Sequence, residues 1–255
     1  MAENSGIEWT HHTFNPWIGC TKVSAACDHC YAEAWDKRGL QGLPARWGPH
    51  AERTRTKTWG NPVKWQKKAK ADGVQYRVFC ASLADVFDNH KSILPAWRRE
   101  LWALIASCPD LDFLMLTKRP QNIMRFLPDD WGDGYANVWL GATVESQKEA
   151  DRLDALTAVP AAVRFLSMEP LLGRVDLSQH IDKLHWIITG GENGKHYRPV
   201  DPDWFRLLRD QCTAADVPFL FKQWEGESQK IIKAKGRALD GVVHDGYPTP
   251  FAANT

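Results

Sequence analysis

The chain has 255 residues, of which 44% are hydrophobic and 25% are charged, and its formal net charge is +1. This composition is ordinary for a globular protein whose core needs no disulfide staples, and the length suits one domain of barrel size. No apolar run is long enough to span a bilayer, and the polar segment 1–13 lacks the apolar centre of a signal peptide. We therefore expect a cytoplasmic protein with no membrane partner, in a compartment where its six cysteines stay reduced.

The predicted elements alternate between short apolar runs and longer amphipathic stretches. A first strand at about 14–19 and a helix after Cys30 open the series. Further strands are expected at 77–82, 112–117, 138–143, 163–167, 185–190 and 218–222, and helices at 92–107, 120–127, 146–158 and 202–215. Ser146 and Asp201 are predicted N-caps, and Pro202 suits the first helical position.

Strands that are apolar on both faces and alternate with helices indicate a parallel sheet. The pattern therefore predicts an α/β protein, a partial (β/α) TIM-like barrel of about six or seven parallel strands. We expect this barrel to cover residues 1–225 and a polar C-terminal tail to cover 226–255.

A basic, Trp-rich insertion is predicted at about 39–72, where strand periodicity is lost. Between Arg46 and Lys70 there are eight basic residues and one acidic residue, a local net charge of +7. Trp102, Trp139 and Trp186 lie in apolar stretches and are expected in the core. The tryptophans that stand beside Gly, Pro or basic residues are expected to line a cleft: Trp17, Trp47, Trp59, Trp65 and Trp224.

Basic residues interleaved with aromatic ones follow the charge-and-stacking pattern of nucleic-acid binding. A solvated charged face explains the same run of charges and stays open as an alternative. The candidate nucleic-acid residues are Arg46, Arg53, Arg55, Lys57, Trp59, Lys64, Lys67 and Lys68.

Three cysteines stand within eleven residues, as Cys20, Cys27 and Cys30 in a C-x6-C-x2-C spacing. Thiolates at this spacing suit an iron–sulfur cluster or zinc. Structural zinc needs a fourth ligand, which would have to be His29, His11, His12 or a distant residue. Three unrelated thiols are the remaining interpretation.

Polar or charged residues follow six successive predicted strands. In a parallel βα barrel the carboxyl ends of the strands carry the functional residues, although strand ends are also polar simply because loops are. The residues at these ends are Ser82, Asp85, Thr117, Lys118, Arg119, Thr143, Glu145, Ser167, Glu169, Gly190, Gly191, Glu192, Lys222 and Gln223.

A three-cysteine loop directly after the first strand, with an aromatic residue after its last cysteine, resembles the radical S-adenosylmethionine (SAM) superfamily. The usual spacing there is C-x3-C-x2-C, so the first gap here is longer. The chain resembles more closely the phage- and prophage-encoded three-cysteine-motif proteins of unknown function. The matching phrases run from Asn15-Pro16-Trp17-Ile18-Gly19-Cys20 and Cys30-Tyr31-Ala32-Glu33 through Leu116-Thr117-Lys118-Arg119-Pro120, Ser167-Met168-Glu169-Pro170-Leu171-Leu172-Gly173 and Gly190-Gly191-Glu192 to Phe221-Lys222-Gln223-Trp224.

This resemblance implies that Cys20, Cys27 and Cys30 bind a [4Fe–4S] cluster whose fourth iron chelates SAM. Reductive cleavage of SAM would then give a 5′-deoxyadenosyl radical that abstracts a hydrogen from substrate. The implied cofactor-binding residues are Tyr31, Ser82, Asp85, Thr143, Glu145, Ser167, Glu169, Gly190 and Gly191. Lys118, Glu192 and Lys222 are the catalytic candidates, with the two lysines and Arg119 suited to an anionic group.

The leading hypothesis is therefore a radical-SAM-like enzyme acting on a nucleotide or nucleic acid. Its expected partners are an electron donor protein and a protein encoded alongside it. Two alternatives remain, a zinc-stabilised nucleic-acid-binding module without catalysis and an Fe–S redox sensor.

Overall fold

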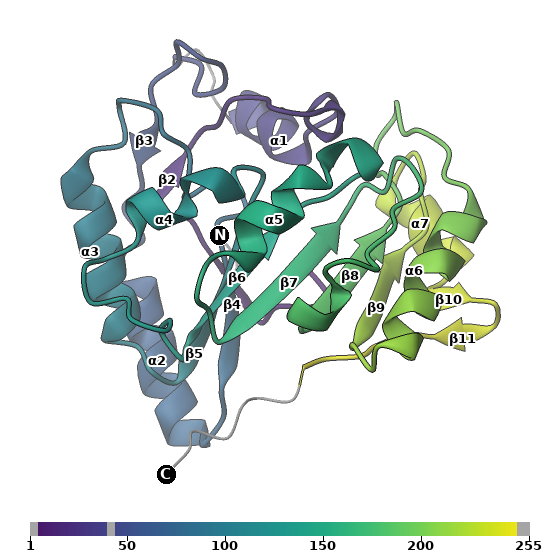
Figure 1. The fold of residues 1–255 in the computed structure, drawn as a ribbon. Helices are drawn as coiled ribbons and strands as arrows, with labels where there is room; N and C mark the ends of the chain where they lie inside the picture. Colours follow the sequence, from purple (N-terminus) through teal and green to yellow (C-terminus); the bar gives the residue numbers. More distant parts are fainter. Residues whose placement is uncertain (1–4, 40–43, 249–255) are drawn as a thin grey trace. The chain divides into compact units, whose positions relative to one another are not determined.

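The computed structural model describes residues 5–39 and 44–248, which are drawn in colour in Figure 1. The chain divides into two compact units. Among the described residues, unit 1 comprises 5–23, 32–39, 44–140 and 160–162, and unit 2 comprises 24–31, 141–159 and 163–248.

Unit 1 is built around parallel strands β1 (His12–Phe14), β4 (Tyr76–Cys80) and β5 (Leu111–Thr117). β5 is buried along almost its whole length, as the continuous apolar run predicts. The helices of the unit are α1 (Tyr31–Gly39), α2 (Asn61–Asp72), α3 (Pro95–Ala106) and, after a 3-10 turn at Pro120–Asn122, α4 (Ile123–Phe126). Pro62 and Pro95 stand in the first turns of α2 and α3, where a missing backbone N–H costs nothing.

Unit 2 is built around parallel strands β7 (Val163–Met168), β8 (Trp186–Gly190) and β9 (Phe219–Gln223). Helix α6 (Pro202–Ala214) lies beside β8 and β9 (Figure 1) and begins at Asp201, whose carboxylate accepts a hydrogen bond from the Asp203 N–H at 2.9 Å. Ser146 begins a capping box before α5 (Asp151–Thr157). The predicted caps are therefore confirmed.

The main sheet has the strand order β1-β4-β5-β6-β7-β8-β9, with β6 at Val138–Ala142. Strands that neighbour one another in chain order are characteristic of a (β/α) barrel, whereas a doubly wound sheet reverses its order. The predicted α/β class and partial barrel are confirmed. Among the described helices, none is both long enough and apolar enough to cross a membrane.

The predicted insertion at 39–72, of which residues 40–43 lie outside the described part, carries α2 and the short strand β3 (Thr54–Arg55). β3 pairs antiparallel with β2 (Trp17–Ile18). The predicted tail at 226–255, described as far as 248, contains α7 (Gln229–Lys235) and the hairpin of β10 (Ala238–Leu239) and β11 (Val242–Val243). The division at residue 225 stays a prediction.

Tryptophan burial follows the prediction in part. Trp102, Trp139 and Trp186 are buried, as expected. Trp17 and Trp65, expected to line a cleft, are instead 0% and 3% exposed. That prediction was wrong because Trp65 is on the buried side of the amphipathic helix α2, where it stacks on His12 at a centroid distance of 4.4 Å.

Candidate active site

The segment at Cys20 is held in unit 1 by the guanidinium group of Arg119. This side chain follows β5, is buried, and donates from Nη1 to the Cys20 Sγ at 3.6 Å and from Nη2 to the Thr21 carbonyl at 2.6 Å. Burial raises the pKa of the Cys20 thiol to about 12, with the Asp85 charge adding to the effect, while Arg119 opposes it. A buried cation in contact with this sulfur favours its thiolate form.

Two buried aspartates balance the buried arginines of unit 1. Asp85, after β4, accepts hydrogen bonds from Thr117 Oγ1 at 2.8 Å and from Arg119 at 2.9 Å. Asp88 accepts from Arg53, whose side chain is fully buried and which also donates to Thr21 Oγ1 at 2.6 Å. The side chain of Asp85, which is predicted to bind the cofactor, therefore holds Arg119 in place.

Unit 2 holds the other part of the cysteine loop, which we define as residues 20–30, through Glu145. Ser24 donates from Oγ to the Glu145 Oε1 at 2.7 Å, and Arg152 donates to the Glu145 Oε2 at 2.7 Å. Glu145 is 1% exposed, so its charge is balanced by Arg152 and satisfied inside the unit. The structure gives this predicted SAM-binding residue a role in anchoring the loop.

Glu192 makes a second anchor in unit 2. It accepts hydrogen bonds from the Arg198 side chain at 2.5 and 2.8 Å, and the His29 Nδ1 lies 3.2 Å from its Oε1. Arg198 also donates to the Ala25 carbonyl at 3.1 Å, within the cysteine loop. Burial acts to raise the pKa of Glu192, but the hydrogen bonds from Arg198 outweigh it and leave this pKa below its usual value.

Glu169 and Lys222 form a half-buried ion pair in unit 2, with the Lys222 Nζ 2.5 Å from the Glu169 Oε1. They follow β7 and end β9, two strands whose carboxyl ends are brought to the same edge by the parallel pairing with β8. Glu169 and Lys222 are thus predicted site residues that pair with each other, as Asp85 and Arg119 do in unit 1.

The glycines after β8 are explained by the neighbouring chain segment. A Cβ atom on Gly191 would lie 2.2 Å from the backbone nitrogen of Glu225, so only glycine fits there. A Cβ atom on Gly190 would meet Gln223 at 3.4 Å, which is ordinary contact. Gly191, which the resemblance assigns to cofactor binding, is therefore approached closely by the backbone of Glu225.

The remaining predicted cofactor residues differ in accessibility. Thr143 and Ser167 are buried, and the Thr143 carbonyl accepts a hydrogen bond from Arg152 at 2.7 Å. Ser82 accepts from the Asn15 amide at 3.0 Å in unit 1. Tyr31 is 57% exposed at the start of α1, and Lys118 is half-buried.

The predicted nucleic-acid residues separate into two groups. Arg53 is buried and bonded internally, which differs from the expectation, because its guanidinium group satisfies Asp88 and three backbone carbonyls. Arg46 pairs with the buried Asp36, and Arg55 lies over the Trp59 ring at 4.2 Å and pairs with Glu100. The exposed residues are Lys57, Lys64, Lys67 and Lys68, the last paired with Asp72 at 2.6 Å.

The donor set of the cysteine loop fits a thiolate-ligated cluster. Cys20, Cys27 and Cys30 are free thiols, and Cys20 and Cys30 are partly exposed. Within residues 5–39 and 44–248, no three His, Cys, Asp or Glu side chains are gathered around a position for a metal ion. The Cys20 thiol, which accepts a hydrogen bond from the buried Arg119, suits a cluster that carries negative charge on its sulfurs.

The sequence reasoning missed Arg152, Arg198 and Asp88, which secure the loop. Nothing in their local sequence marks them, since each acts through a partner in another element. His29 is expected from the sequence only as a fourth zinc ligand, and the structure places its ring beside Glu192. Arg119 is different, because it stands at the end of a predicted strand and was expected to meet an anionic group.

Comparisons with known proteins place the chain within one family. A family model described as "Protein of unknown function (DUF5131)" matches residues 4–248. This description mentions no phage or prophage, so that part of the resemblance stays a prediction. No curated protein matches the chain.

Three solved structures of spore photoproduct lyase are similar at low identity. A mutant form has a TM-score of 0.47 at 12% identity, over 82% of this chain and 62% of the other. A mutant with bound AdoMet and dinucleoside spore photoproduct also has a TM-score of 0.47 at 12% identity, over 79% and 61%. A complex with dinucleoside spore photoproduct has a TM-score of 0.43 at 10% identity, over 76% and 58%, so the chain spans about three-fifths of each.

Proposed function

We propose that this chain, which belongs to the DUF5131 family, is a radical-SAM-like enzyme acting on a nucleotide or nucleic acid. The observation that carries the proposal is the C-x6-C-x2-C loop, which stands between the first strand and first helix of a (β/α) barrel. Active sites of such barrels are built from the loops that follow the strands.

Cys20, Cys27 and Cys30 would hold a [4Fe–4S] cluster as thiolates. When bound, a cluster of this kind supplies single electrons and an iron that no cysteine ligates, which is the position that the resemblance assigns to SAM. The protein then has to keep three thiolates oriented and shielded from water.

Residues of both units support this task. Arg119 donates to the Cys20 sulfur and would stabilise its thiolate by charge and hydrogen bonding. Glu145 and Glu192 orient the loop through Ser24, His29 and, by way of Arg198, the Ala25 carbonyl. Hydrogen bonds of this kind position ligands and tune a metal centre.

Glu169 and Lys222 are the charged pair that we assign to SAM. Their charges are opposite to those of the amino and carboxylate groups of an amino acid, and in this structure each charge satisfies the other at 2.5 Å. Glu169 would pair with the amino group of SAM and Lys222 with its carboxylate. Because both side chains are already largely removed from water, forming these two pairs would cost little further desolvation. Glu169→Gln should therefore weaken SAM binding while leaving the iron content unchanged.

The substrate class is supported by exposed basic residues. Lys57, Lys64 and Lys67 are exposed in a segment that also presents the Arg55–Trp59 stack. Lysines beside an aromatic ring suit a phosphate backbone and an unstacked base. An electron donor protein is required by the same chemistry.

The test is anaerobic reconstitution with iron and sulfide, followed by incubation with SAM and dithionite. About four irons per chain and formation of 5′-deoxyadenosine are expected. Cys27→Ala should abolish both. Cys108→Ala is the matched control, because this thiol is also buried but lies outside the loop, and it should retain both.

The alternatives give different results in the same experiment. One tightly held zinc and no iron would overturn the proposal in favour of a structural zinc module, whose unfolding by chelators would then be expected. Iron without 5′-deoxyadenosine would indicate an Fe–S redox sensor.

A further inference from the structure

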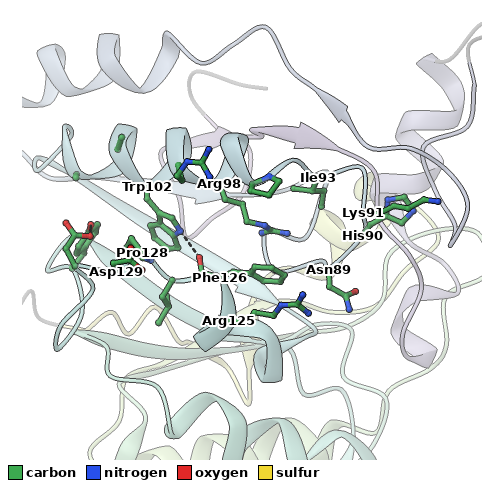
Figure 2. Close-up of a pocket in the computed structure, with 17 residues that line it drawn as sticks. Asn89, His90, Lys91, Ile93, Arg98, Trp102, Arg125, Phe126, Pro128 and Asp129 are labelled. Carbon is green, nitrogen blue, oxygen red and sulfur yellow. Dashed lines mark hydrogen bonds between the residues drawn. The ribbon is translucent and has the colours of Figure 1, made fainter.

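Unit 1 contains a cavity of about 820 Å³ that none of the predicted sites includes. Its walls come from the segment before α3, from α3 itself and from residues 125–135 (Figure 2). Its volume is in the range of cavities that hold a ligand the size of a nucleotide.

The guanidinium groups of Arg98 and Arg125 both lie near the Phe126 ring in this cavity. The Arg98 guanidinium carbon lies 3.8 Å from the centroid of the Phe126 ring, and that of Arg125 lies 5.4 Å from the same centroid. Arg98 is fixed in this place because its two terminal nitrogens donate to the carbonyls of Val86 and Asp88. The ring and the Arg98 guanidinium together make a rigid, flat and positively charged platform.

The exposed basic residues of this cavity differ from Arg98, which lies near two aspartates. Burial lowers the pKa of Arg98 to about 10, the charges of Asp88 and Asp85 oppose this shift, and the positive charge of Arg125 adds to it. Among the residues that the structure describes, no carboxylate is paired with Arg125, Arg99 or Lys91, all three of which are exposed and line the cavity. An anion bound here would relieve the repulsion between neighbouring cations.

The opposite end of the cavity carries acidic and aromatic groups. Asp129 lies at this end, away from Lys91 (Figure 2). Asp130 is next to it and accepts a hydrogen bond from the Tyr135 hydroxyl at 2.7 Å. Between the two ends, the buried Trp102 donates its indole N–H to the Phe126 carbonyl at 2.8 Å. A ligand with negative charge throughout would meet repulsion at Asp129, so the anionic group belongs at one end only.

We propose that this cavity binds a nucleoside monophosphate unit, either free or as one nucleotide of a single strand. The phosphate would lie at Arg125 and its basic neighbours Arg99 and Lys91, and the base would pack beside the stacked Arg98 and Phe126 side chains. Bases stack readily on arginine planes and aromatic rings, and arginine is well suited to phosphate.

A second cavity of about 590 Å³ adjoins the same segment. Asn89, His90 and Lys91 line both cavities, and the second is also lined by Thr21 and Arg119, which contact each other beside Cys20. If the proposed function holds, a nucleic-acid strand anchored in the first cavity would extend toward the chemistry at Cys20. The binding site itself does not depend on that function.

The experiment measures fluorescence anisotropy of a labelled single-stranded DNA of about 12 nucleotides on the iron-free full-length chain, with AMP as competitor. Arg125→Ala should weaken binding about tenfold and reduce the slope of log affinity against log salt by about 1. Lys230→Ala, at an exposed position of α7 in unit 2, is the control and should leave binding unchanged. Thermal unfolding of both variants checks that they fold.

The two sources of the ligand are separated by the competitor. Displacement of the DNA by AMP supports a site for free nucleotides, whereas DNA binding that is sensitive to Arg125→Ala but not to AMP supports a site for a strand. The proposal is overturned if neither DNA nor AMP binds, or if Lys230→Ala weakens binding as much as Arg125→Ala does. Since no iron is present, failure of cluster assembly does not affect this result.

Discussion

The two ends of the cysteine loop are held in opposite ways. In unit 1 the segment after Cys20 accepts hydrogen bonds from two buried arginines, Arg53 and Arg119, whose charges are balanced by aspartates. In unit 2 the loop reaches buried carboxylates, Glu145 and Glu192, whose charges are balanced by arginines. The Thr21 carbonyl and the Cys20 sulfur accept hydrogen bonds, so the unit 1 end of the loop is held by arginine donors. The Ser24 hydroxyl can donate, so the unit 2 end is held by a carboxylate acceptor.

The two ends of the loop also differ in the number of residues that hold them. Arg53 alone donates to three backbone carbonyls, a hydroxyl and a carboxylate. The anchors of unit 2 are spread over Ser24, His29 and Arg198. We therefore expect one substitution at the unit 1 end to cause a large loss of stability, and each substitution at the unit 2 end to cause a small one.

The largest effect is expected for Arg53→Met. It leaves Asp88 buried without its hydrogen-bonded cation, because the Arg119 Nε is 3.9 Å away, and the free energy of unfolding should fall by about 3–5 kcal/mol. Urea unfolding measures this change. Arg99→Met, at an exposed site, is the control and should stay within about 0.5 kcal/mol of wild type. Equal stability of the two variants would contradict the assignment of Arg53 to an internal role.

A smaller loss is expected for Gly191→Ala in unit 2. Its Cβ atom would meet backbone atoms of Glu225, which cannot move aside as a side chain can, so a cost of about 1–3 kcal/mol is expected. Gly190→Ala is the matched control, with its nearest contact at 3.4 Å. If both variants are equally stable in thermal unfolding, the close approach at residue 225 is not the reason for this glycine.

Ser24→Ala tests one of the distributed anchors. Loss of its hydrogen bond to Glu145 should lower the free energy of unfolding by about 1 kcal/mol, well below the effect at Arg53. In a Glu145→Gln background the same substitution should cost clearly less, because the charged acceptor is already gone. A full loss in both backgrounds would show that Ser24 acts through another partner.

The smallest effect is expected from the pH dependence of Glu192. Its pKa in the folded protein lies below the usual 4.5, so its stabilising contribution is present above pH 4.5 and is lost as the pH falls through the lowered value. Glu192→Gln should therefore lose less stability than wild type between about pH 5 and pH 3. If the stability of the two proteins falls in parallel as the pH is lowered, Glu192 does not stabilise the loop through its charge.

The barrel could be predicted from local signals in the sequence. Each apolar run from 77–82 to 218–222 is a strand of the parallel sheet, because a strand buried on both faces leaves a continuous apolar run in the sequence. The caps at Ser146 and Asp201 are also local, since a cap acts on the next few residues. The cysteine spacing is a local signal of the same kind.

Which polar residues are available to a ligand depends on contacts between segments that are distant in the sequence. Ser24 and Glu145 are separated by 121 residues in the chain, and His29 and Glu192 by 163, so no local pattern reveals that they are partners. Arg53 is a second example, because its sequence context predicts an exposed charge whereas its side chain is fully buried. A charged residue can be buried only where its counter-charge is placed beside it, and that placement depends on how distant segments pack.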